Sequence, residues 1–318
     1  MTDAAKILVS IVCPVFNEQD NIDLFITEVK HSVGTLNGIS LEFIFVNDGS
    51  TDNTLSICLA RLDQDCIIKV CDLSRNFGKE AALTAGLRLA EGCAVIPMDV
   101  DLQDPPEILV SMIEKWKEGF EVVFARRIDR SSDFFLKRLT ANLFYFVHNK
   151  ISGNQIPNNV GDFRLMDRLV VDAVNEFNER NRFMKGLLSW VGFRSTYVDY
   201  KRPTRSSGQS KFNWAKLFGL AVEGITSFST APLRLCSYVG LLIASISFGY
   251  ASYIILRVTM FGIEVPGYAS IMVLISILGG IQLIAIGFLG EYIGRTYFEV
   301  KGRPLYVVRK IHINTQRD

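Results

Sequence analysis

Short apolar runs alternate with amphipathic stretches along the chain up to about residue 130. The apolar runs are rich in β-branched and aromatic residues, as strands are, and lie at Ile7–Val12, Leu41–Val46, Ile67–Cys71, Ala94–Met98 and Glu121–Phe124. Stretches with a helical period separate them, at Asn21–Val33, Thr54–Leu62, Lys79–Ala90 and Pro106–Trp116. This alternation predicts an α/β domain with a mostly parallel sheet covered by helices on both faces.

Beyond this region the pattern becomes more helical and predicts helices over Phe134–Lys150 and Leu169–Glu179. Residues 201–211 form a basic loop in which Pro203 is the single apolar residue. The next segment, Phe212–Phe228, is amphipathic and directly precedes a long apolar run, so we interpret it as a helix at a membrane interface. An ordinary surface helix of the domain is the alternative.

Two long runs carry no charged residue, Leu235–Leu256 and Val265–Gly290. A helix rises about 1.5 Å per residue, so each run can cross a hydrocarbon core of about 30 Å. A helical hairpin buried in a soluble core is the alternative. The runs divide the chain into a domain at 1–211, a juxtamembrane helix at 212–232, transmembrane helices at 233–257 and 265–290, and a tail at 291–318.

The charges beside these runs predict their orientation. The connector from Arg257 to Glu264 carries one charge of each sign, whereas the other flanks are basic. The basic residues are Lys201, Arg202, Arg205, Lys211, Lys216 and Arg234 before the spans, and Arg295, Lys301, Arg303, Arg309 and Lys310 after them. This asymmetry predicts a two-span protein of the inner (plasma) membrane with the domain and the tail in the cytoplasm. A channel would need more polar residues than Gln282 and a few hydroxyls within its spans.

The overall composition narrows the class of protein further. The chain has 318 residues, 49% hydrophobic, with a mean hydropathy of +0.23, which excludes a disordered chain and a collagen-like repeat. Its 34 Lys+Arg and 33 Asp+Glu nearly balance, so we expect no nucleic-acid partner. The six cysteines form no CxxC pair and are expected to be buried, reduced thiols. The oligomeric state is open, and a homo-oligomer is one alternative.

Polar clusters follow several of the apolar runs. They are Pro14–Glu18, Val46–Asp52, Met98–Pro106 and Gly161–Arg164. Ligands of open α/β sheets bind beyond the carboxyl ends of the strands, so these clusters are the candidate site.

Asp99 and Asp101 are the strongest candidates for metal ligands. Two carboxylates this close repel each other unless a cation lies nearby, and hard oxygen ligands favour Mg²⁺ or Mn²⁺. Gln103 is a candidate for a further ligand. The clusters also allow purely structural interpretations: an aspartate before Pro105 capping the next helix, a tight turn at Asp48-Gly49-Ser50, and helix caps at Asp52 and at Asn17-Glu18.

Read in order, the first three clusters resemble the GT-A, Rossmann-like nucleotide-sugar-binding domain of family 2 glycosyltransferases. Further segments resemble the polyprenyl-phosphate branch of that family, of the bactoprenol glucosyltransferase type and related to dolichol-phosphate mannosyltransferases. These segments are Ser74–Glu80, Gly161–Arg168, Arg205–Lys211, Gly290–Arg295 and Arg303–Tyr306. The resemblance covers nearly the whole chain, including both spans. It departs at Asn47, where the family usually has an aspartate.

The resemblance implies inverting transfer of a sugar to undecaprenyl (polyprenyl) phosphate on the cytoplasmic membrane face, with glucose from UDP-glucose as the expected donor sugar. GDP-mannose and UDP-formamido-arabinose are alternative donors. An alternative of another class is an inactive, membrane-anchored nucleotide-sugar-binding protein.

The resemblance also implies roles for individual residues. The expected nucleotide-sugar-binding residues are Pro14, Asn17, Glu18, Asp48, Lys79 and Asp99. The expected ligands of Mg²⁺ or Mn²⁺ are Asp101 and Gln103. The expected catalytic residues are Asp162, Asp101, Arg205 and Lys211, and those binding the lipid phosphate are Arg202, Arg205 and Lys211. Whether Asp162 acts as a base or only positions substrate is open.

Overall fold

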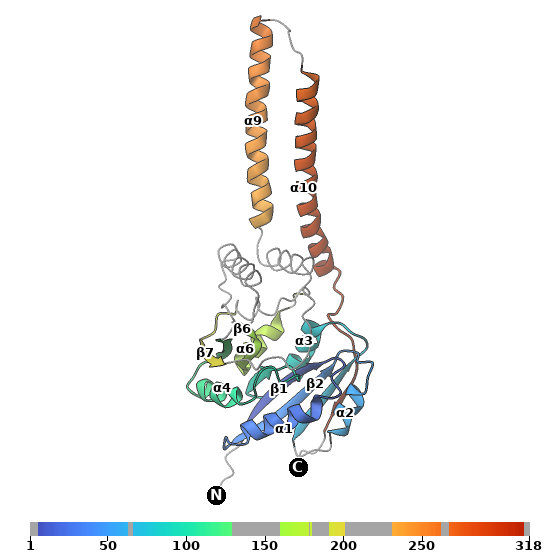
Figure 1. The fold of residues 1–318 in the computed structure, drawn as a ribbon, viewed down its shortest axis with the longest axis vertical. Helices are drawn as coiled ribbons and strands as arrows, with labels where there is room; N and C mark the ends of the chain where they lie inside the picture. Colours follow the sequence, from blue (N-terminus) through green and yellow to red (C-terminus); the bar gives the residue numbers. More distant parts are fainter. Residues whose placement is uncertain are drawn as a thin grey trace. The chain divides into compact units, whose positions relative to one another are not determined.

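The computed structural model describes residues 6–62, 66–128, 160–177, 179, 191–200, 231–261 and 267–314 (Figure 1). The chain divides into two compact units, residues 1–149 with 153–213 and 303–318, and residues 150–152 with 214–302. The helix predicted at 134–150, the basic loop at 201–211 and the interfacial helix at 212–228 lie outside the described residues.

The first unit contains one eight-stranded sheet in the order β7-β5-β6-β4-β1-β2-β3-β8. Its strands are β1 (Ile7–Val15), β2 (Ile39–Asn47), β3 (Ile67–Leu73), β4 (Ala94–Pro97), β5 (Val122–Arg127), β6 (Val160–Asp167), β7 (Ser195–Tyr200) and β8 (Val308–Ile313). The five predicted strands are all present as β1 to β5. Strands β6, β7 and β8 were not predicted.

The sheet is parallel at its centre and mixed toward both edges. Strand β1 pairs in parallel with β2 and β4, and β2 with β3. Strand β6 runs antiparallel between β4 and β5, and β8 runs antiparallel along β3. In the edge strand β7 exposed residues alternate with half-buried ones, and β8 is almost entirely exposed. Both contain several polar residues, so they lack the long apolar runs that mark β1 and β2.

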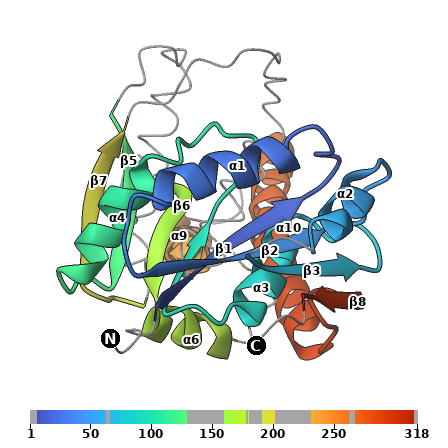
Figure 2. The same ribbon diagram turned by 90° about the horizontal axis from the view of Figure 1, so that it is seen from below.

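Helices cover both faces of this sheet (Figure 2). They are α1 (Ile22–Val33), α2 (Thr54–Ala60), α3 (Lys79–Leu89), α4 (Ile108–Lys117) and α6 (Arg168–Glu176). Helices α1 and α4 lie on one face, and α3 and α6 on the other. The predicted helices correspond to these, and the arrangement confirms the α/β class.

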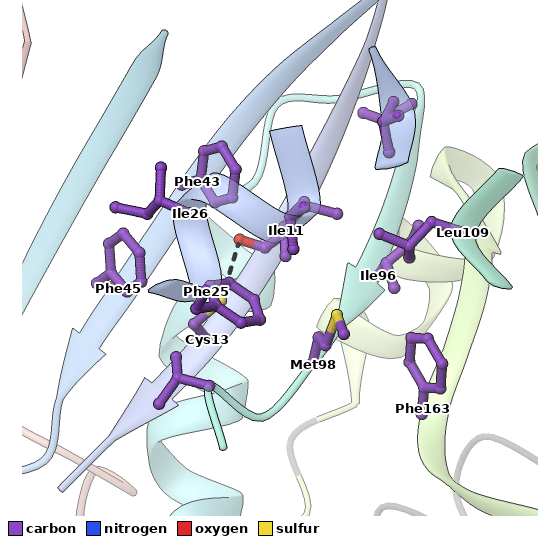
Figure 3. Close-up of a cluster of buried hydrophobic side chains, with 14 of the residues drawn as sticks. Ile11, Cys13, Phe25, Ile26, Phe43, Phe45, Ile96, Met98, Leu109 and Phe163 are labelled. Carbon is purple, nitrogen blue, oxygen red and sulfur yellow. Dashed lines mark hydrogen bonds between the residues drawn. The ribbon is translucent and has the colours of Figure 1, made fainter. Parts of the chain in front are cut away.

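Aromatic and aliphatic side chains fill the layer between the sheet and α1 (Figure 3). The Phe25 ring meets Phe43 and Phe45 edge-on at 6.4 and 6.5 Å between centroids. Such edge-to-face pairs add to the free energy gained from burying the rings.

Five described cysteines are free thiols. Cys13, Cys58 and Cys71 are buried, and burial raises the pKa of Cys58 to about 12 and that of Cys71 to about 11. These thiols therefore stay protonated and inert, as predicted. Cys93 is exposed, which differs from the expectation of burial.

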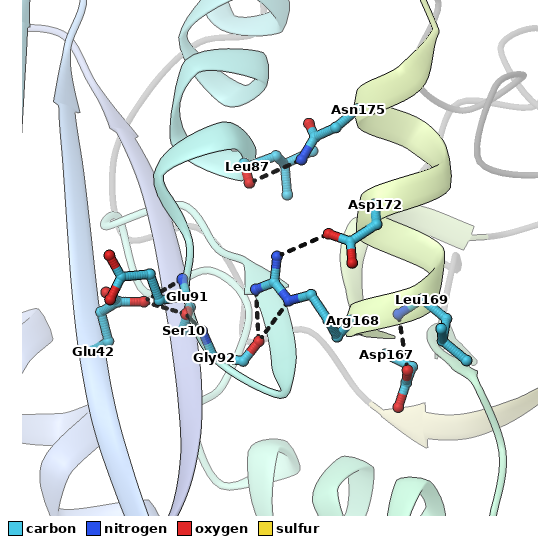
Figure 4. Close-up of polar contacts among 10 residues, drawn as sticks. All are labelled: Ser10, Glu42, Leu87, Glu91, Gly92, Asp167, Arg168, Leu169, Asp172 and Asn175. Atoms are coloured by element: carbon cyan, nitrogen blue, oxygen red, sulfur yellow. Dashed lines mark hydrogen bonds and ion pairs between the residues drawn. The ribbon is translucent and has the colours of Figure 1, made fainter.

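A buried polar network lies toward the amino-terminal ends of the central strands (Figure 4). The fully buried Glu42 carboxylate accepts hydrogen bonds from the Ser10 hydroxyl and, at 3.0 Å, from the Glu91 amide. It also forms an ion pair of 2.7 Å with the ammonium of Lys69, which reaches Glu91 at 2.8 Å. This network closes the turn between α3 and β4.

Two long helices form the second unit, α9 (Ala231–Phe261) and α10 (Tyr268–Val300), and they contact each other. Each contains a segment long and apolar enough to cross a membrane, Tyr238–Phe261 and Ile277–Val300. Neither apolar window is buried within the chain. The alternative of a hairpin buried in a soluble core is therefore wrong.

Helix α10 continues beyond the charge-free run that predicted it. It passes Glu291 and ends at Val300, before Gly302 at φ 70° and Pro304. A glycine with positive φ followed by proline is a common helix end. The tail expected from residue 291 therefore begins with a helical segment, and it goes on to form β8 in the sheet of the first unit.

We predict that Glu42→Ala destabilises the domain by about 3 kcal/mol, because it removes one partner of a buried ion pair. Thermal unfolding of the detergent-solubilised protein measures this loss. Glu91→Ala is the control: its side chain is 52% exposed, and losing such a pair costs about 1 kcal/mol or less. Equal losses in both variants would contradict a buried role for Glu42.

Candidate active site

A cavity of about 310 Å³ opens at the carboxyl-terminal edge of the central strands. Its lining comes from the ends of β1, β2 and β4 and from the loop that leads into α3. The lining residues are Pro14, Val15, Phe16, Glu18, Asp48, Asn76, Gly78, Lys79, Asp99, Val100 and Asp101. Because β1, β2 and β4 run in parallel, their carboxyl ends meet at this edge. Ligands of such sheets bind at this edge.

Asp48 holds two loops of the cavity together. Its carboxylate accepts hydrogen bonds from the amides of Phe77 at 2.7 Å and Gly78 at 2.9 Å. Next to it, Gly49 has φ +70°, and a Cβ there would lie 2.6 Å from the backbone of Arg75 and Asn76. The loops thus approach as closely as their backbones allow. The tight turn expected at Asp48 is present, and its carboxylate also lines the cavity.

The loop after β1 is bound to the loop after β2. The Asn17 side-chain oxygen accepts from the Thr51 amide at 2.8 Å, and the Glu18 amide donates to the Thr54 hydroxyl at 2.8 Å. The N-cap position of α1 is Asn21, whose side chain makes no capping hydrogen bond, and not Asn17 or Glu18. Asn17 and Glu18 therefore position the rim of the cavity, and Glu18 also lines it.

At the start of α2, the Asp52 carboxylate accepts from the Thr54 amide at 3.0 Å and from its hydroxyl at 2.6 Å. The cap position itself is Asn53. Asp52 therefore stabilises the first turn of α2, which is close to the capping role that the sequence allowed.

Three charges meet at one end of the cavity. The Lys79 ammonium lies 2.7 Å from an Asp99 carboxylate oxygen and 3.6 Å from one of Asp162. Burial alone would lower the pKa of Lys79, but the carboxylates of Asp99 and Asp162 outweigh it and raise this pKa. Lys79 therefore remains a cation and offsets the repulsion between the two carboxylates.

Asp162 reaches the site because β6 pairs antiparallel with β4. The register pairs Ala94 with Asp167, so the beginning of β6 lies beside the end of β4. Asp162 thus lies inside a strand, near its start, and not in the loop that precedes it. Its Oδ1 atom is buried and accepts no hydrogen bond from the described residues.

Arg164 supports the strand beneath Asp162. Its guanidinium is fully buried, donates to the Gly161 carbonyl at 2.7 Å and lies over the Phe124 ring at 5.1 Å. Burial lowers the pKa of Arg164 to about 10, against the opposing effect of Asp162 and Glu80, so it stays charged near neutral pH. Its contacts fix the backbone that carries Asp162.

The loop after β4 contains a strained residue. Leu102 has φ 52°, and the neighbouring Asp101 carboxylate accepts from the Gln103 amide at 3.1 Å. A leucine in this conformation costs roughly 1–3 kcal/mol, a strain found mostly at functional sites. The Tyr200 hydroxyl donates to Asp104 at 2.6 Å and anchors the far end of the loop. This contact differs from a simple capping role for Asp104.

The donor set fits Mg²⁺ or Mn²⁺ held jointly with a ligand. Asp99 and Asp101 both line the cavity and offer hard carboxylate oxygens, with Gln103 two residues beyond. Within the described ranges, no three His, Cys, Asp or Glu residues cluster closely enough to hold an ion by themselves. Oxygens from a bound substrate or water would have to complete the coordination shell.

Most of the predicted site residues come together here. Pro14, Glu18, Asp48, Lys79, Asp99 and Asp101 line one cavity, Asn17 lies at its rim, and Asp162 contacts Lys79. Arg202, Arg205 and Lys211 lie outside the described residues.

Five lining residues were not assigned a role from the sequence: Val15, Phe16, Asn76, Gly78 and Val100. Each lies inside a motif whose charged members were assigned to the site. Their position within these motifs was the sequence signal that could have identified them as lining residues. Phe16 is 45% exposed and offers an aromatic face to the cavity.

Known proteins share both parts of the chain. The profile of the family "Glycosyl transferase family 2" matches residues 10–174, and that of the "GtrB C-terminal hairpin" matches residues 231–296. The chain is 53% identical to the SfII prophage-derived bactoprenol glucosyl transferase of Shigella flexneri, over 96% of this chain and 98% of that protein. It is 52% identical to the prophage bactoprenol glucosyl transferase homolog of Escherichia coli (strain K12), over 95% and 99%.

Among solved structures, mannosyl-3-phosphoglycerate synthase from Rubrobacter xylanophilus is similar at a TM-score of 0.47 and 16% identity, covering 82% of this chain and 78% of that chain. The first profile covers most of β1 to β6, and the second covers α9 and most of α10. The chain belongs to glycosyltransferase family 2, as a GT-A enzyme with a GtrB-type C-terminal hairpin.

Proposed function

We propose that this enzyme transfers glucose from UDP-glucose to polyprenyl (undecaprenyl) phosphate, with inversion, at the cytoplasmic face of the membrane. The observation that carries the proposal is the cavity lined by Asp48, Lys79, Asp99 and Asp101 in a chain 53% identical to a bactoprenol glucosyl transferase. GDP-mannose and UDP-formamido-arabinose are the alternative donors.

The cavity suits the donor from its base to its diphosphate. The exposed face of Phe16 is available for stacking on a base. The Lys79 ammonium, now paired with Asp99, has the charge and the flexible stem to turn toward phosphate oxygens. Asp101, Asp99 and Gln103 would hold Mg²⁺ or Mn²⁺, which supplies positive charge against the leaving diphosphate.

The acceptor requires little activation. A phosphate monoester has a second pKa of about 6 and is largely dianionic in the cytoplasm. It can attack without losing a proton, so Asp162 is assigned to positioning the acceptor or the sugar rather than to base catalysis. A single in-line displacement inverts the anomeric centre. The presence of Asp99, Asp101, Gln103 and Asp162 argues against the inactive alternative.

A donor screen tests the proposed function. Purified enzyme in detergent receives C55 polyprenyl phosphate, a divalent metal and one labelled donor at a time. Lipid-linked sugar should form from UDP-glucose in large excess over the other donors. Faster transfer from GDP-mannose or UDP-formamido-arabinose would reassign the sugar, and turnover from none would support the inactive alternative.

We predict that Asp101→Asn lowers turnover by about a hundredfold or more while the melting temperature stays near that of the wild type, because a neutral amide binds a divalent cation poorly. Chelation of the wild type with EDTA should have the same effect, and added Mn²⁺ should reverse it. Full activity in excess EDTA would contradict the metal assignment. Glu107→Gln, at the start of α4 and outside the cavity lining, is the control.

The basic loop gives a second prediction. We expect Arg205 and Lys211 to bind phosphate oxygens of the acceptor or donor, Arg through its planar fork and Lys as a mobile charge. Arg205→Ala and Lys211→Ala should each lower turnover by about a hundredfold with short soluble acceptors in neutral detergent. Near-normal turnover would mean that these residues, with Arg202, serve only to attract anionic headgroups.

The sheet supports the proposed topology. Strand β8 follows α10 yet pairs with β3, so the chain before α9 and the chain after α10 belong to one folded unit. This pairing supports an arrangement in which both lie on one side of the membrane while α9 and α10 both cross it. A reporter fused after Asp318 should be cytoplasmic and one inserted at Gly262 should lie on the opposite side. Cytoplasmic signals from both would refute the two-span arrangement.

A further inference from the structure

Strand β8 contains an irregularity next to the candidate site. Its register pairs Asp72 with Lys310 but Leu73 with Val308, so Arg309 is an extra residue on the β8 side. A bulge of this kind re-aims a side chain and is found preferentially at sheet edges beside active sites.

Arg309 binds the end of β3 at two places. Its Nη2 atom donates to the Ser74 carbonyl at 2.9 Å, and its Nη1 atom lies 3.5 Å from Asp72 Oδ2. Beside it, the Ser74 amide donates to the Val307 carbonyl at 2.9 Å. The Asp72 side chain is only 6% exposed, whereas that of Arg309 is 63% exposed. Arg309 thus covers a nearly buried carboxylate from the solvent side.

Asp72 extends this contact to the neighbouring strand. Its Oδ1 atom accepts from the Asn47 side-chain amide at 2.8 Å, and the Asn47 side-chain oxygen accepts from the Ser50 amide at 3.1 Å. An aspartate at position 47 would bring a second carboxylate to within hydrogen-bonding distance of Asp72. The pairing with Asp72 therefore favours an amide over a carboxylate at position 47.

Both ends of this chain of contacts lead to the donor cavity. Ser74 begins the loop that carries Asn76 and Gly78, and Asn47 directly precedes Asp48. Asp48 joins the two loops at the cavity, while Arg309 and Asp72 join them at their bases. A residue beyond both membrane helices in sequence thus fixes the spacing of the two loops.

We propose that Arg309 is a positioning residue for the donor, which sets the separation of the loops at 47–50 and 74–78 through Asp72 and Asn47. Arg309 does not line the cavity and acts only through these residues. The inference rests on the proposed function in that the ligand of the cavity is a nucleoside diphosphate sugar. The proposal makes the affinity for the nucleotide depend on β8, the strand that follows α10 in the sequence.

The experiment uses the full-length enzyme in detergent and measures UDP binding with Mn²⁺ by calorimetry, alongside steady-state kinetics. Arg309→Ala should weaken UDP binding by about tenfold, the effect of losing one hydrogen bond to a charged group. KM for the donor should rise in parallel, while kcat and KM for the acceptor stay unchanged. A purely structural role would lower the melting temperature without this split between KM and kcat.

Matched variants make the test specific. Lys310→Ala removes the same charge from the next position of β8 and should bind UDP like the wild type. Asn47→Asp should weaken binding, and the exchange Asn47→Asp with Asp72→Asn should restore most of it, because one carboxylate and one amide again face each other. Arg309→Lys, which keeps the charge but not the forked geometry, should fall between wild type and Arg309→Ala.

Wild-type UDP affinity in a folded Arg309→Ala enzyme, or an equal loss of UDP affinity in Lys310→Ala, overturns the inference about Arg309 but leaves the proposed function intact. If Arg309→Ala does not fold, unchanged affinity in both Arg309→Lys and Asn47→Asp overturns it. A wild-type enzyme that binds neither UDP nor GDP with Mn²⁺ overturns the proposed function, and the inference with it.

Discussion

The ammonium of Lys79 between two carboxylates is the interaction on which the rest of the site depends. Asp99 comes from the end of β4 and Asp162 from the start of β6, so the sheet brings two negative charges to one edge. Without a cation they would repel each other and would also repel an anionic ligand of the cavity. Lys79 occupies this place, and in the proposed function its flexible side chain exchanges the carboxylate partners for phosphates of the donor.

The surrounding protein is arranged to keep that edge rigid. Asp48 binds backbone amides of the loop before α3, and Arg164 fixes the backbone that carries Asp162. At the other end of the strands, Glu42 and Lys69 close the α3–β4 turn. Rigid strand ends carry short loops whose side chains meet at the cavity, which is how a sheet positions groups for binding a flexible diphosphate.

The sequence predicted the parts that rest on local patterns. Strands β1 to β5 are mostly apolar runs, and α1 to α4 follow from helical periodicity. Asp48, Asp99 and Asp101 could be placed at one edge because parallel strands end together, whereas Lys79 was assigned through the resemblance to a known family. Strand β6 could not be predicted, because Asp162 and Arg164 interrupt its apolar pattern. Strand β8 could not be predicted either. Its sequence VRKIHI was interpreted as a basic flank of a membrane span, and its partner strand β3 is remote in the sequence. The link from Arg309 to Asn47 therefore emerges only from the fold.

The most direct test of the central claim is a titration of Mn²⁺ into the wild-type enzyme with and without saturating UDP. Because Lys79 holds Asp99, and because no three carboxylate, histidine or cysteine side chains of the described residues cluster closely enough to hold an ion, Mn²⁺ alone should bind weakly. UDP should tighten Mn²⁺ binding by about tenfold or more, and Mn²⁺ should tighten UDP binding by the same factor. Equal Mn²⁺ affinity with and without UDP would contradict a site that the protein and the donor diphosphate complete together.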